Sequence, residues 1–307
     1  MIIDIFIPTY KSDDKLNKLL KQLYKQSILP RKIYILHTQE YEGQIQKLPE
    51  IHESNIEVLP IKKENFDHGG TRGYGASLSD ADIYMFMTQD AIPADEMLIE
   101  NLIKPFSEDV EGIIAATFAR QLSNKNDKII EKYTRTFNYP NKSRIKSHND
   151  LEELGIKTYF CSNVCSAYKR EVYNEMGGFV TRTIFNEDMI MAFDIINNGY
   201  SIAYVSDAKV IHSHKYSYIQ QFTRNFDLGV SHNEYSHLFN NVKSESEGIK
   251  LVKNSLKFLI AKKKYYLIPD LIINSAFKLL GYKLGRKYDK LPKKLVLKFS
   301  MNKNYWI

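Results

Sequence analysis

The stretch that decides the fold runs from Asn65 to Pro93 and reads NFDHGGTRGYGASLSDADIYMFMTQDAIP. Its first half carries four glycines in seven positions, which predicts a loop that enters a short helix and offers free N–H groups to an anion. Its second half, the apolar run from Ile83 to Met87, is typical of a buried strand, and Asp90 follows it. Either half alone is weak evidence. Together they indicate a ligand site, because ligands bind at the carboxyl ends of strands in an open α/β sheet.

Apolar segments and helical patterns alternate on both sides of this stretch. The sequence predicts strands at residues 2–7, 32–36, 56–61, 112–118, 159–168, 200–205 and 209–211. It predicts helices at 16–23, 97–106, 171–176 and 187–195, and a long, partly helical excursion from 120 to 157. This alternation predicts an α/β fold in which a largely parallel, mixed sheet is flanked by helices. We expect a main domain over residues 1–214 and a C-terminal helical region over 215–307.

The composition indicates a folded protein of enzyme size. The chain has 307 residues, of which 43% are hydrophobic, so it can bury one large core or two modest ones. Cys161 and Cys165 lack the paired spacing of a zinc site, and we expect them to be reduced, buried thiols in a cytoplasmic protein. The N-terminal apolar run contains an acid and predicts a strand rather than a signal peptide, and no apolar run is long enough for a transmembrane helix.

The net charge of +7 is unevenly distributed. From Lys250 to Ile307 there are fifteen Lys and Arg but only Asp270 and Asp289, a balance of +13, which leaves −6 for the preceding residues. The basic character therefore belongs to the C-terminal region.

Three polar segments lie at the ends of predicted strands or at the start of a predicted helix. They are Gln89-Asp90, Glu187-Asp188 and His212-Ser213-His214. Each has a structural explanation by itself, since an acid can cap a turn or complement a helix dipole, and most single histidines are hydrogen-bonded and partly buried. Only the combination favours a catalytic site.

A series of short segments, taken in order, resembles one enzyme family. The segments are Ile7-Pro8-Thr9-Tyr10, Phe66-Asp67-His68-Gly69-Gly70-Thr71-Arg72, Thr88-Gln89-Asp90-Ala91, Glu187-Asp188-Met189 and His212-Ser213-His214, with further similarity over 216–229 and 279–286. They resemble the bacterial rhamnosyltransferase branch of the family-two inverting glycosyltransferases over nearly the whole chain. The resemblance implies a GT-A (Rossmann-like) fold and a nucleotide-diphosphate sugar donor.

The resemblance also implies a divalent cation, Mn²⁺ or Mg²⁺. Asp90 matches the metal-binding acid of the family, although Thr88 and Gln89 replace the neighbouring acids, and His212 matches a histidine that related enzymes supply to the metal. An imidazole ligand favours Mn²⁺ over Mg²⁺. The sequence does not decide between His212 and His214, because alternate residues of a strand point to opposite faces.

Asp188 matches the family's general base. Such a base is needed because a sugar hydroxyl is a poor nucleophile until a carboxylate takes its proton. The resemblance implies that Arg224 or Arg72, together with the metal, offsets the charge on the leaving diphosphate. One displacement then inverts the anomeric centre without a covalent enzyme intermediate.

The remaining expected site residues follow from the family positions. The expected donor-binding residues are Pro8, Thr9, Tyr10, Gln39, Asp67, His68, Arg72, Gln89, Asp90 and Arg224. The expected acceptor-binding residues are Glu187, Cys161, Ser162 and Asn163. Gln39 stands near the end of the second strand, where many relatives have an acid that reads the nucleobase, so the identity of the base is left open.

The C-terminal region has two interpretations. Ile249, Val252, Leu256 and Leu259 mark one helical face and three lysines another, followed by Lys262-Lys263-Lys264. A basic amphipathic helix of this kind can lie on an anionic membrane. It can equally pack on the sheet or form a contact in a homo-oligomer. No recognised nucleic-acid-binding motif is present.

We expect a cytoplasmic glycosyltransferase that is peripheral on the inner face of the cytoplasmic membrane. From the resemblance, the expected reaction moves L-rhamnose from dTDP-L-rhamnose to a lipid-linked cell-surface polysaccharide. The alternatives are a transferase of another hexose from a UDP-sugar, and a non-catalytic sugar- or nucleotide-binding protein of the same fold.

Overall fold

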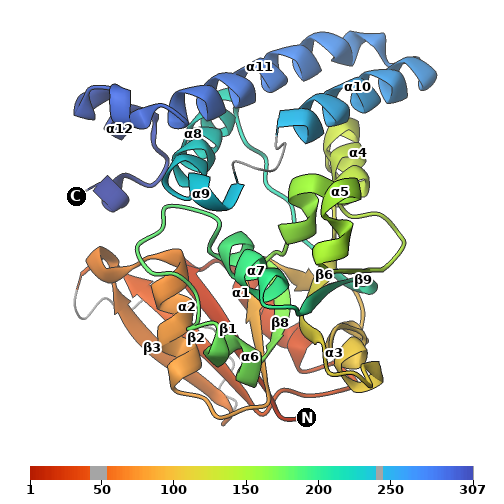
Figure 1. The fold of residues 1–307 in the computed structure, drawn as a ribbon, viewed down its shortest axis with the longest axis vertical. Coiled ribbons are helices and arrows are strands. Elements are labelled where there is room, and N and C mark those ends of the chain that lie inside the picture. The colour runs from red at the N-terminus through yellow and green to blue at the C-terminus, as the bar shows by residue number, and fades with distance from the viewer. Residues whose placement is uncertain (42–53, 240–244, 307) are drawn as a thin grey trace.

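The computed structural model describes residues 1–41, 54–239 and 245–306. Its strands form one sheet in the order β3-β2-β1-β4-β8-β6-β9-β5, with β7 paired to β9 (Figure 1). The strands are β1 (Ile3–Tyr10), β2 (Lys32–Gln39), β3 (Ile56–Lys62), β4 (Ile83–Met87), β5 (Ile92–Pro93), β6 (Ile114–Leu122), β7 (Arg144–Lys146), β8 (Cys165–Lys169) and β9 (Ser201–Ile211). The predicted α/β class with a largely parallel, mixed sheet is confirmed.

The direction of the strands brings distant segments to one edge. β1, β2, β3 and β4 run parallel to one another, and β8 runs antiparallel to both β4 and β6. β6 therefore points the same way as β4, and β9 is parallel to β6. The carboxyl ends of β1, β2, β4, β6 and β9 thus lie along the same edge, which is where ligands bind in such sheets.

Helices cover both faces of the sheet. Helices α1 (Asp14–Leu23) and α3 (Leu98–Glu108) pack on one face through leucine and isoleucine side chains. These share one core with alternate residues of β1, β2 and β4, and α3 lies against β6 and β9. Helices α2 (His68–Ser77), α6 (Arg170–Glu175) and α7 (Glu187–Asn197) cover the other face. The core there is rich in aromatic rings, with Phe6 and Phe86 at its centre.

The predicted short helix is present as α2, but the four glycines lie inside it rather than in a loop before it, so the predicted loop with free N–H groups for an anion is wrong. Asp67 caps α2, and its side chain accepts hydrogen bonds from the N–H groups of Gly69 and Gly70, which are therefore not free. The glycines serve close packing instead, because a Cβ on Gly69 would lie 1.9 Å from the carbonyl oxygen of Val180. A Cβ on Gly75 would lie 3.0 Å from Leu36.

Several element boundaries differ from the sequence prediction. β1 and β2 extend to Tyr10 and Gln39, and the predicted strand at 159–168 begins only at Cys165. The strands predicted at 200–205 and 209–211 are one strand, β9, whose pairing with β6 shifts register after Val205. This irregularity interrupts the apolar pattern without ending the strand. The excursion at 120–157 contains α4 (Ile129–Asn138), β7 and α5 (Leu151–Leu154).

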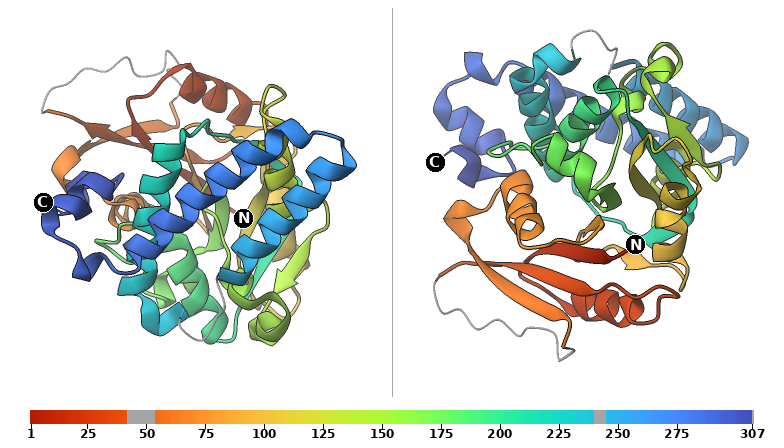
Figure 2. Two further views of the ribbon diagram at one scale, coloured as in Figure 1. Left: turned by 90° about the horizontal axis from the view of Figure 1, so that it is seen from above. Right: turned by 60° about the horizontal axis from the view of Figure 1, so that its bottom comes forward.

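The C-terminal region consists of helices above the sheet edge (Figures 1 and 2). They are α8 (Tyr218–Glu234), α9 (Ser236–Phe239), α10 (Glu245–Ala261), α11 (Ile268–Gly285) and α12 (Lys293–Phe299). α11 crosses α8 closely, because a Cβ on Gly281 or Gly285 would lie 2.2 or 2.0 Å from a backbone oxygen of Phe222 or Phe226. In the part of the chain that the structure describes, no helix is long and apolar enough to cross a membrane.

Candidate functional site

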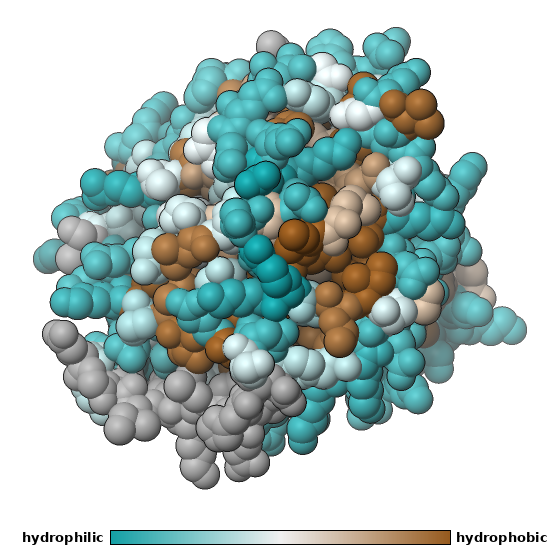
Figure 3. Space-filling view, turned by 90° about the horizontal axis from the view of Figure 1, so that it is seen from below, coloured by the Kyte–Doolittle hydropathy of each residue, from teal (hydrophilic) through white to brown (hydrophobic). Residues whose placement is uncertain are grey.

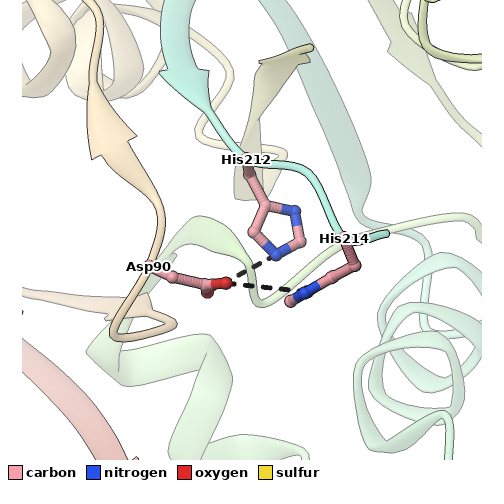
Figure 4. A group of neighbouring side chains, drawn as sticks. All are labelled: Asp90, His212 and His214. Atoms are coloured by element: carbon pink, nitrogen blue, oxygen red, sulfur yellow. Dashed lines mark ion pairs between the residues drawn. The ribbon is translucent and has the colours of Figure 1, made fainter. Parts of the chain in front are cut away.

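Asp90, His212 and His214 come together at the carboxyl edge of the sheet. Nε2 of His212 lies 3.5 Å from Oδ1 of Asp90, and Nε2 of His214 lies 3.7 Å from Oδ2. The three ligand atoms lie within 4.8 Å of one another, and both imidazoles turn toward the carboxylate (Figure 4). Asp90 and His212 meet as expected from the sequence.

Both histidines face Asp90 because β9 ends at Ile211. The alternation of side chains that left His212 and His214 undecided applies only within a strand, and these residues follow it. Asp90 follows β4 in the same way, two residues beyond a turn-forming Thr88 whose carbonyl accepts from the N–H of Ala91. β8 and β6 separate β4 from β9 in the sheet, and the two segments meet because Asp90 precedes β5, whose Ile92 pairs with Ile211 at the end of β9.

The chemistry of these three groups fits a divalent cation. Burial and the nearby positive groups His214 and Arg135 lower the pKa of His212 to about 2, so its imidazole is neutral and offers a lone pair. Burial also lowers the pKa of His214. One carboxylate and two neutral imidazoles form a donor set that suits a transition metal better than it suits Mg²⁺.

Three residues near this group had not been identified from the sequence. Oε1 of Gln121, on β6, lies 3.0 Å from Nδ1 of His212 and also accepts a hydrogen bond from Arg135 of α4. Nζ of Lys15, at the start of α1, lies 4.0 Å from Oδ2 of Asp90. Gln121 and Arg135 fall where the sequence pattern loses its periodicity, and no local signal distinguishes them.

Asp188 lies in the first turn of α7, after Asn186, which has a positive φ of 69°. Its carboxylate accepts hydrogen bonds from the backbone N–H groups of Asn163, at 3.1 Å, and Met189, at 2.8 Å. Burial and the adjacent Glu187 carboxylate raise the pKa of Asp188 to about 7. A half-buried carboxylate with this pKa is suited to take a proton near neutral pH.

Glu187 is enclosed and fully paired. Oε1 of Glu187 lies 3.0 Å from Nη1 of Arg72 and accepts a hydrogen bond from Nδ2 of Asn163 at 3.2 Å. Burial opposes ionisation of Glu187, but Arg72 and His68 outweigh burial and lower its pKa. Arg72, which is 4% exposed, also donates to the carbonyl of His68. The structure therefore places Arg72 inside the protein, against Glu187.

The residues expected to bind the donor lie along the same sheet edge but differ in exposure. Tyr10 is exposed and Pro8 and Gln39 are half-buried, whereas Thr9 is buried and contacts His37 through a 3.0 Å hydrogen bond. Gln89 forms two hydrogen bonds with the backbone of Tyr10. Its amide therefore joins the ends of β1 and β4.

Arg224, on α8, has its guanidinium 4.8 Å from the ring centre of Phe185. It forms no ion pair with any carboxylate in the described part of the chain, so the surface ion pair considered as an alternative is not seen there. The positive charge of Arg224 lowers the pKa of both His212 and His214, which places Arg224 within electrostatic reach of the three-residue group.

The residues expected to contact the acceptor are buried. Cys161, Ser162 and Asn163 are 2%, 8% and 2% exposed, and burial raises the pKa of the Cys161 thiol to about 12. Oδ1 of Asn163 accepts hydrogen bonds from Ser166 and Tyr168. This segment lies directly beside Asp188 and supports its carboxylate.

A separate cavity of about 600 Å³ lies between α2 and α6. Its lining includes Gly73, Tyr74, Arg170, Asn174 and Phe179, and none of Asp90, Asp188 or His212.

Comparison with proteins of known structure supports the fold. The chain resembles a mannosyltransferase of Pyrobaculum calidifontis, solved with GDP-Man and Mn²⁺, with a TM-score of 0.57, 15% identity, and coverage of 99% of this chain and 87% of the other. It also resembles residues 1–349 of TarS from S. aureus, solved with UDP-GlcNAc, with a TM-score of 0.51, 12% identity, and coverage of 94% and 92%. The predicted GT-A fold is confirmed.

Sequence relatives cover the whole chain. The O-antigen chain rhamnosyltransferase RfbN of Salmonella typhimurium is 38% identical over 308 positions, which cover 100% of this chain and 96% of the relative. The O-antigen chain rhamnosyltransferase WbaN of Salmonella anatum is 35% identical over 305 positions, which cover 98% and 95%. Residues 4–177 match the model of the glycosyl transferase family 2. The chain therefore belongs to glycosyl transferase family 2.

Proposed function

We propose that the chain transfers L-rhamnose from dTDP-L-rhamnose to a lipid-linked O-antigen-type polysaccharide, with inversion at the anomeric carbon. The observation that carries the proposal is the full-length similarity to two O-antigen chain rhamnosyltransferases, at 38% and 35% identity. The contacts that lead from His212 through Gln121 and Ser162 to the neighbouring Asn163, whose N–H holds Asp188, support the same chemistry.

In this mechanism Asp188 accepts the proton of an acceptor hydroxyl. The hydroxyl oxygen forms a bond to the anomeric carbon of rhamnose while the bond from that carbon to the diphosphate oxygen breaks on the opposite face. The electron pair of the broken bond leaves with dTDP, so no covalent enzyme intermediate forms. The backbone N–H groups of Asn163 and Met189 hold the carboxylate in place.

We place the metal ion on Asp90, His212 and His214, and the two nitrogen ligands favour Mn²⁺ over Mg²⁺. When bound, the ion neutralises charge on the leaving diphosphate. Arg224 and Lys15 add positive charge at the same edge and are assigned to the diphosphate as well.

We assign the donor nucleotide to the ends of β1 and β2. Tyr10 is exposed, and Pro8 and Gln39 are half-buried, so all three are accessible for direct contact. Thr9, His68 and Arg72 support the proposed nucleotide-binding surface through contacts inside the protein, and Asp67 caps the start of α2. On the acceptor side, Glu187, Cys161, Ser162 and Asn163 shape the pocket from beneath, because they are buried.

A panel of nucleotide sugars tests the proposed function. Purified protein is incubated with Mn²⁺, a lipid-linked oligosaccharide acceptor, and dTDP-L-rhamnose, a UDP-hexose or GDP-mannose, and the released nucleotide is measured. We expect release from dTDP-L-rhamnose and a product whose anomeric configuration, read by NMR, is opposite to that of the donor. Faster nucleotide release from a UDP-hexose would show that the donor is a UDP-sugar. Release from none of the donors would favour a non-catalytic binding protein.

The proposal includes a position on the inner, anionic face of the cytoplasmic membrane. Exposed apolar side chains lie on the outer sides of α10 and α11, which we call the C-terminal apolar surface: Ile249, Leu256, Ile260, Ile272, Ile273, Leu279 and Leu280. Exposed lysines flank it, including Lys250, Lys253, Lys257, Lys262, Lys263 and Lys264. The acids Glu247 and Asp270 already contact Lys157 and Lys128. Glu247 also lies 3.6 Å from Lys250, and the positive charge of the other lysines beside apolar groups suits anionic lipid headgroups.

The face of the molecule opposite to α10 and α11 also carries apolar side chains. Seen from below in Figure 3, polar side chains cover most of this face and apolar ones gather near its centre. The orientation with α10 and α11 toward the lipid therefore rests on the lysines that flank the C-terminal apolar surface.

Vesicle sedimentation tests this position. The full chain is mixed with phosphatidylcholine vesicles with or without phosphatidylglycerol, and we expect binding only to the anionic vesicles. Replacing Lys262, Lys263 and Lys264 by Gln should weaken binding about 100-fold, since each lysine near the surface contributes ~1 kcal/mol. The matched control replaces three exposed lysines at and after α1, Lys18, Lys21 and Lys25, and should bind normally. A dimer in solution with no vesicle binding would show that another copy covers this surface.

A further inference from the structure

Gln121 joins the metal-binding group to the segment that supports the base. It is 3% exposed and lies near the end of β6. Its Oε1 is 3.0 Å from Nδ1 of His212, and its Nε2 donates a hydrogen bond to Oγ of Ser162 at 3.0 Å. Ser162 immediately precedes Asn163, whose N–H holds Asp188.

The orientation of the Gln121 amide is fixed by its neighbours. Arg135 donates a hydrogen bond to the Gln121 side chain, and a guanidinium has no acceptor, so the atom that it meets must be the amide oxygen. Turning the amide over would place an NH₂ group against the guanidinium donors. The oxygen therefore also faces His212.

This orientation fixes the tautomer of His212. An amide oxygen only accepts, so the Nδ1 atom 3.0 Å away must carry the proton. The contact from Nη2 of Arg135 to Nδ1 is longer, at 3.5 Å. Nε2 is then left with its lone pair directed at the carboxylate of Asp90, 3.5 Å away. Two acceptors that face each other in this way are stabilised by a cation between them.

We propose that Gln121 is a positioning residue that holds His212 in the Nδ1–H tautomer, with Nε2 available to a metal ion, and ties it to the Ser162–Asn163 segment. In metal sites the second ring nitrogen of a ligating histidine is usually held in this way. The metal part of this inference rests on the proposed function, whereas the tautomer part does not.

The same contacts connect the two halves of the reaction. His212 belongs to the metal-binding group, and Ser162 leads to the N–H group that holds the base. Gln121 therefore couples the position of a metal ligand to the position of Asp188 through a single buried side chain.

The tautomer is measured in the metal-free protein by long-range ¹H–¹⁵N NMR of labelled histidine, with His212→Asn used for assignment. We expect the Nδ1–H form in the wild type, and a shift toward Nε2–H in Gln121→Leu, which keeps the volume but removes the acceptor. Gln121→Glu keeps an acceptor for both Arg135 and His212 and should keep the Nδ1–H form. A wild-type Nε2–H tautomer, or an unchanged tautomer in Gln121→Leu, overturns the inference.

Mn²⁺ affinity is measured on the same variants by calorimetry, without substrate. Gln121→Leu should bind Mn²⁺ about 10- to 100-fold more weakly, the usual loss for such partners, and Gln121→Glu should restore most of the affinity. Ser162→Ala removes the other partner of Gln121 and should weaken Mn²⁺ binding less than Gln121→Leu does, because the amide oxygen that faces His212 remains. Unchanged affinity in Gln121→Leu contradicts the positioning role. If the wild type binds no Mn²⁺, the proposed metal site fails, and the tautomer still decides the role of Gln121.

Discussion

Two acid-containing groups at the sheet edge differ in how completely they are paired. Around Asp90 the basic atoms lie 3.5, 3.7 and 4.0 Å away, too far for hydrogen bonds, and His214 is open to solvent. Around Glu187 the partners lie at 3.0 and 3.2 Å and the side chains are buried. The first group is arranged to receive a cation, whereas the second already contains one, the guanidinium of Arg72.

The comparison separates two carboxylates that are adjacent in the chain. Glu187 faces inward to Arg72 and Asn163, while Asp188 accepts hydrogen bonds from two backbone N–H groups and remains half-buried. Burial and the charge of Glu187 raise the pKa of Asp188 to about 7, whereas the pKa of Glu187 is lowered. We therefore expect Glu187 to stabilise the site and Asp188 to react.

The largest expected effect is on catalysis by Asp188. Asp188→Asn removes the proton acceptor and should lower transfer by ~10²–10⁴-fold, while leaving the affinities for donor and Mn²⁺ unchanged. Single-turnover assays and calorimetry measure these quantities. Asp194→Asn, on the same helix but away from the site, is the control and should remain active. Normal turnover in Asp188→Asn would assign the base elsewhere.

The next effect is on stability and tests whether the buried Glu187–Arg72 ion pair stabilises the fold. Glu187→Gln leaves the Arg72 charge buried without its partner and should lower the free energy of unfolding by ~3 kcal/mol, as breaking buried pairs does. Urea denaturation measures the loss. The double variant Arg72→Met/Glu187→Gln should recover part of it, because no unpaired charge remains. If Glu187→Gln and the wild type had equal free energies of unfolding, the Glu187 pair would contribute no more to stability than the Asp90 group does.

The group of Asp90, His212 and His214 should show the opposite pattern, with a small effect on stability and a large effect on metal binding. Asp90→Asn is expected to change the free energy of unfolding by less than ~0.5 kcal/mol, because the carboxylate makes no short contacts. It should lower Mn²⁺ affinity by about 100-fold or more, since even indirect partners of a metal ligand account for 10- to 100-fold. His214→Ala, compared with His212→Ala, shows whether both imidazoles bind the ion. A large loss of stability in Asp90→Asn, with intact Mn²⁺ affinity, would show that Asp90 has a structural role rather than a metal-binding one.

The smallest effect is the pH dependence of transfer. Asp188 must be ionised to accept a proton, and its pKa is raised to about 7, so the rate should fall about tenfold per pH unit below that value and level off above it. Removing the neighbouring charge with Glu187→Gln should move this limb to lower pH, because Glu187 raises the pKa of Asp188. The measurement is kcat against pH at saturating Mn²⁺. A limb that stays in place would exclude Asp188 as its source.

The sequence was sufficient for the sheet and for part of the site. β4 and Asp90 were predicted because a fully apolar run followed by an acid is a local pattern, whereas β9 was predicted as two shorter strands because polar residues interrupt its apolar pattern. The role of the glycines in α2 was not predicted, because the partner that requires Gly69 is Val180, about a hundred residues away. Composition alone cannot distinguish a glycine needed for an anion from one needed for close packing.

Contacts between polar residues that are distant in the chain could also not be predicted from the sequence. Gln121 and Arg135 carry no pattern of their own, and their role depends on where β9 delivers His212. The pairing of Arg72 with Glu187 likewise depends on α2 and α7 lying side by side. In both cases the residue types were visible, but the partner was set by the tertiary structure.

The glycine contacts between α8 and α11 fix the distance between the sheet-edge site and the C-terminal apolar surface. α8 carries Arg224 toward the sheet edge, and α11, locked against it through Gly281 and Gly285, carries much of the C-terminal apolar surface. With that surface on the bilayer, the reacting carboxylate stands at a constant height above the lipid. Under the proposed orientation, an acceptor would have to present its free end at that height to reach Asp188, so the length of the acceptor would contribute to its selection.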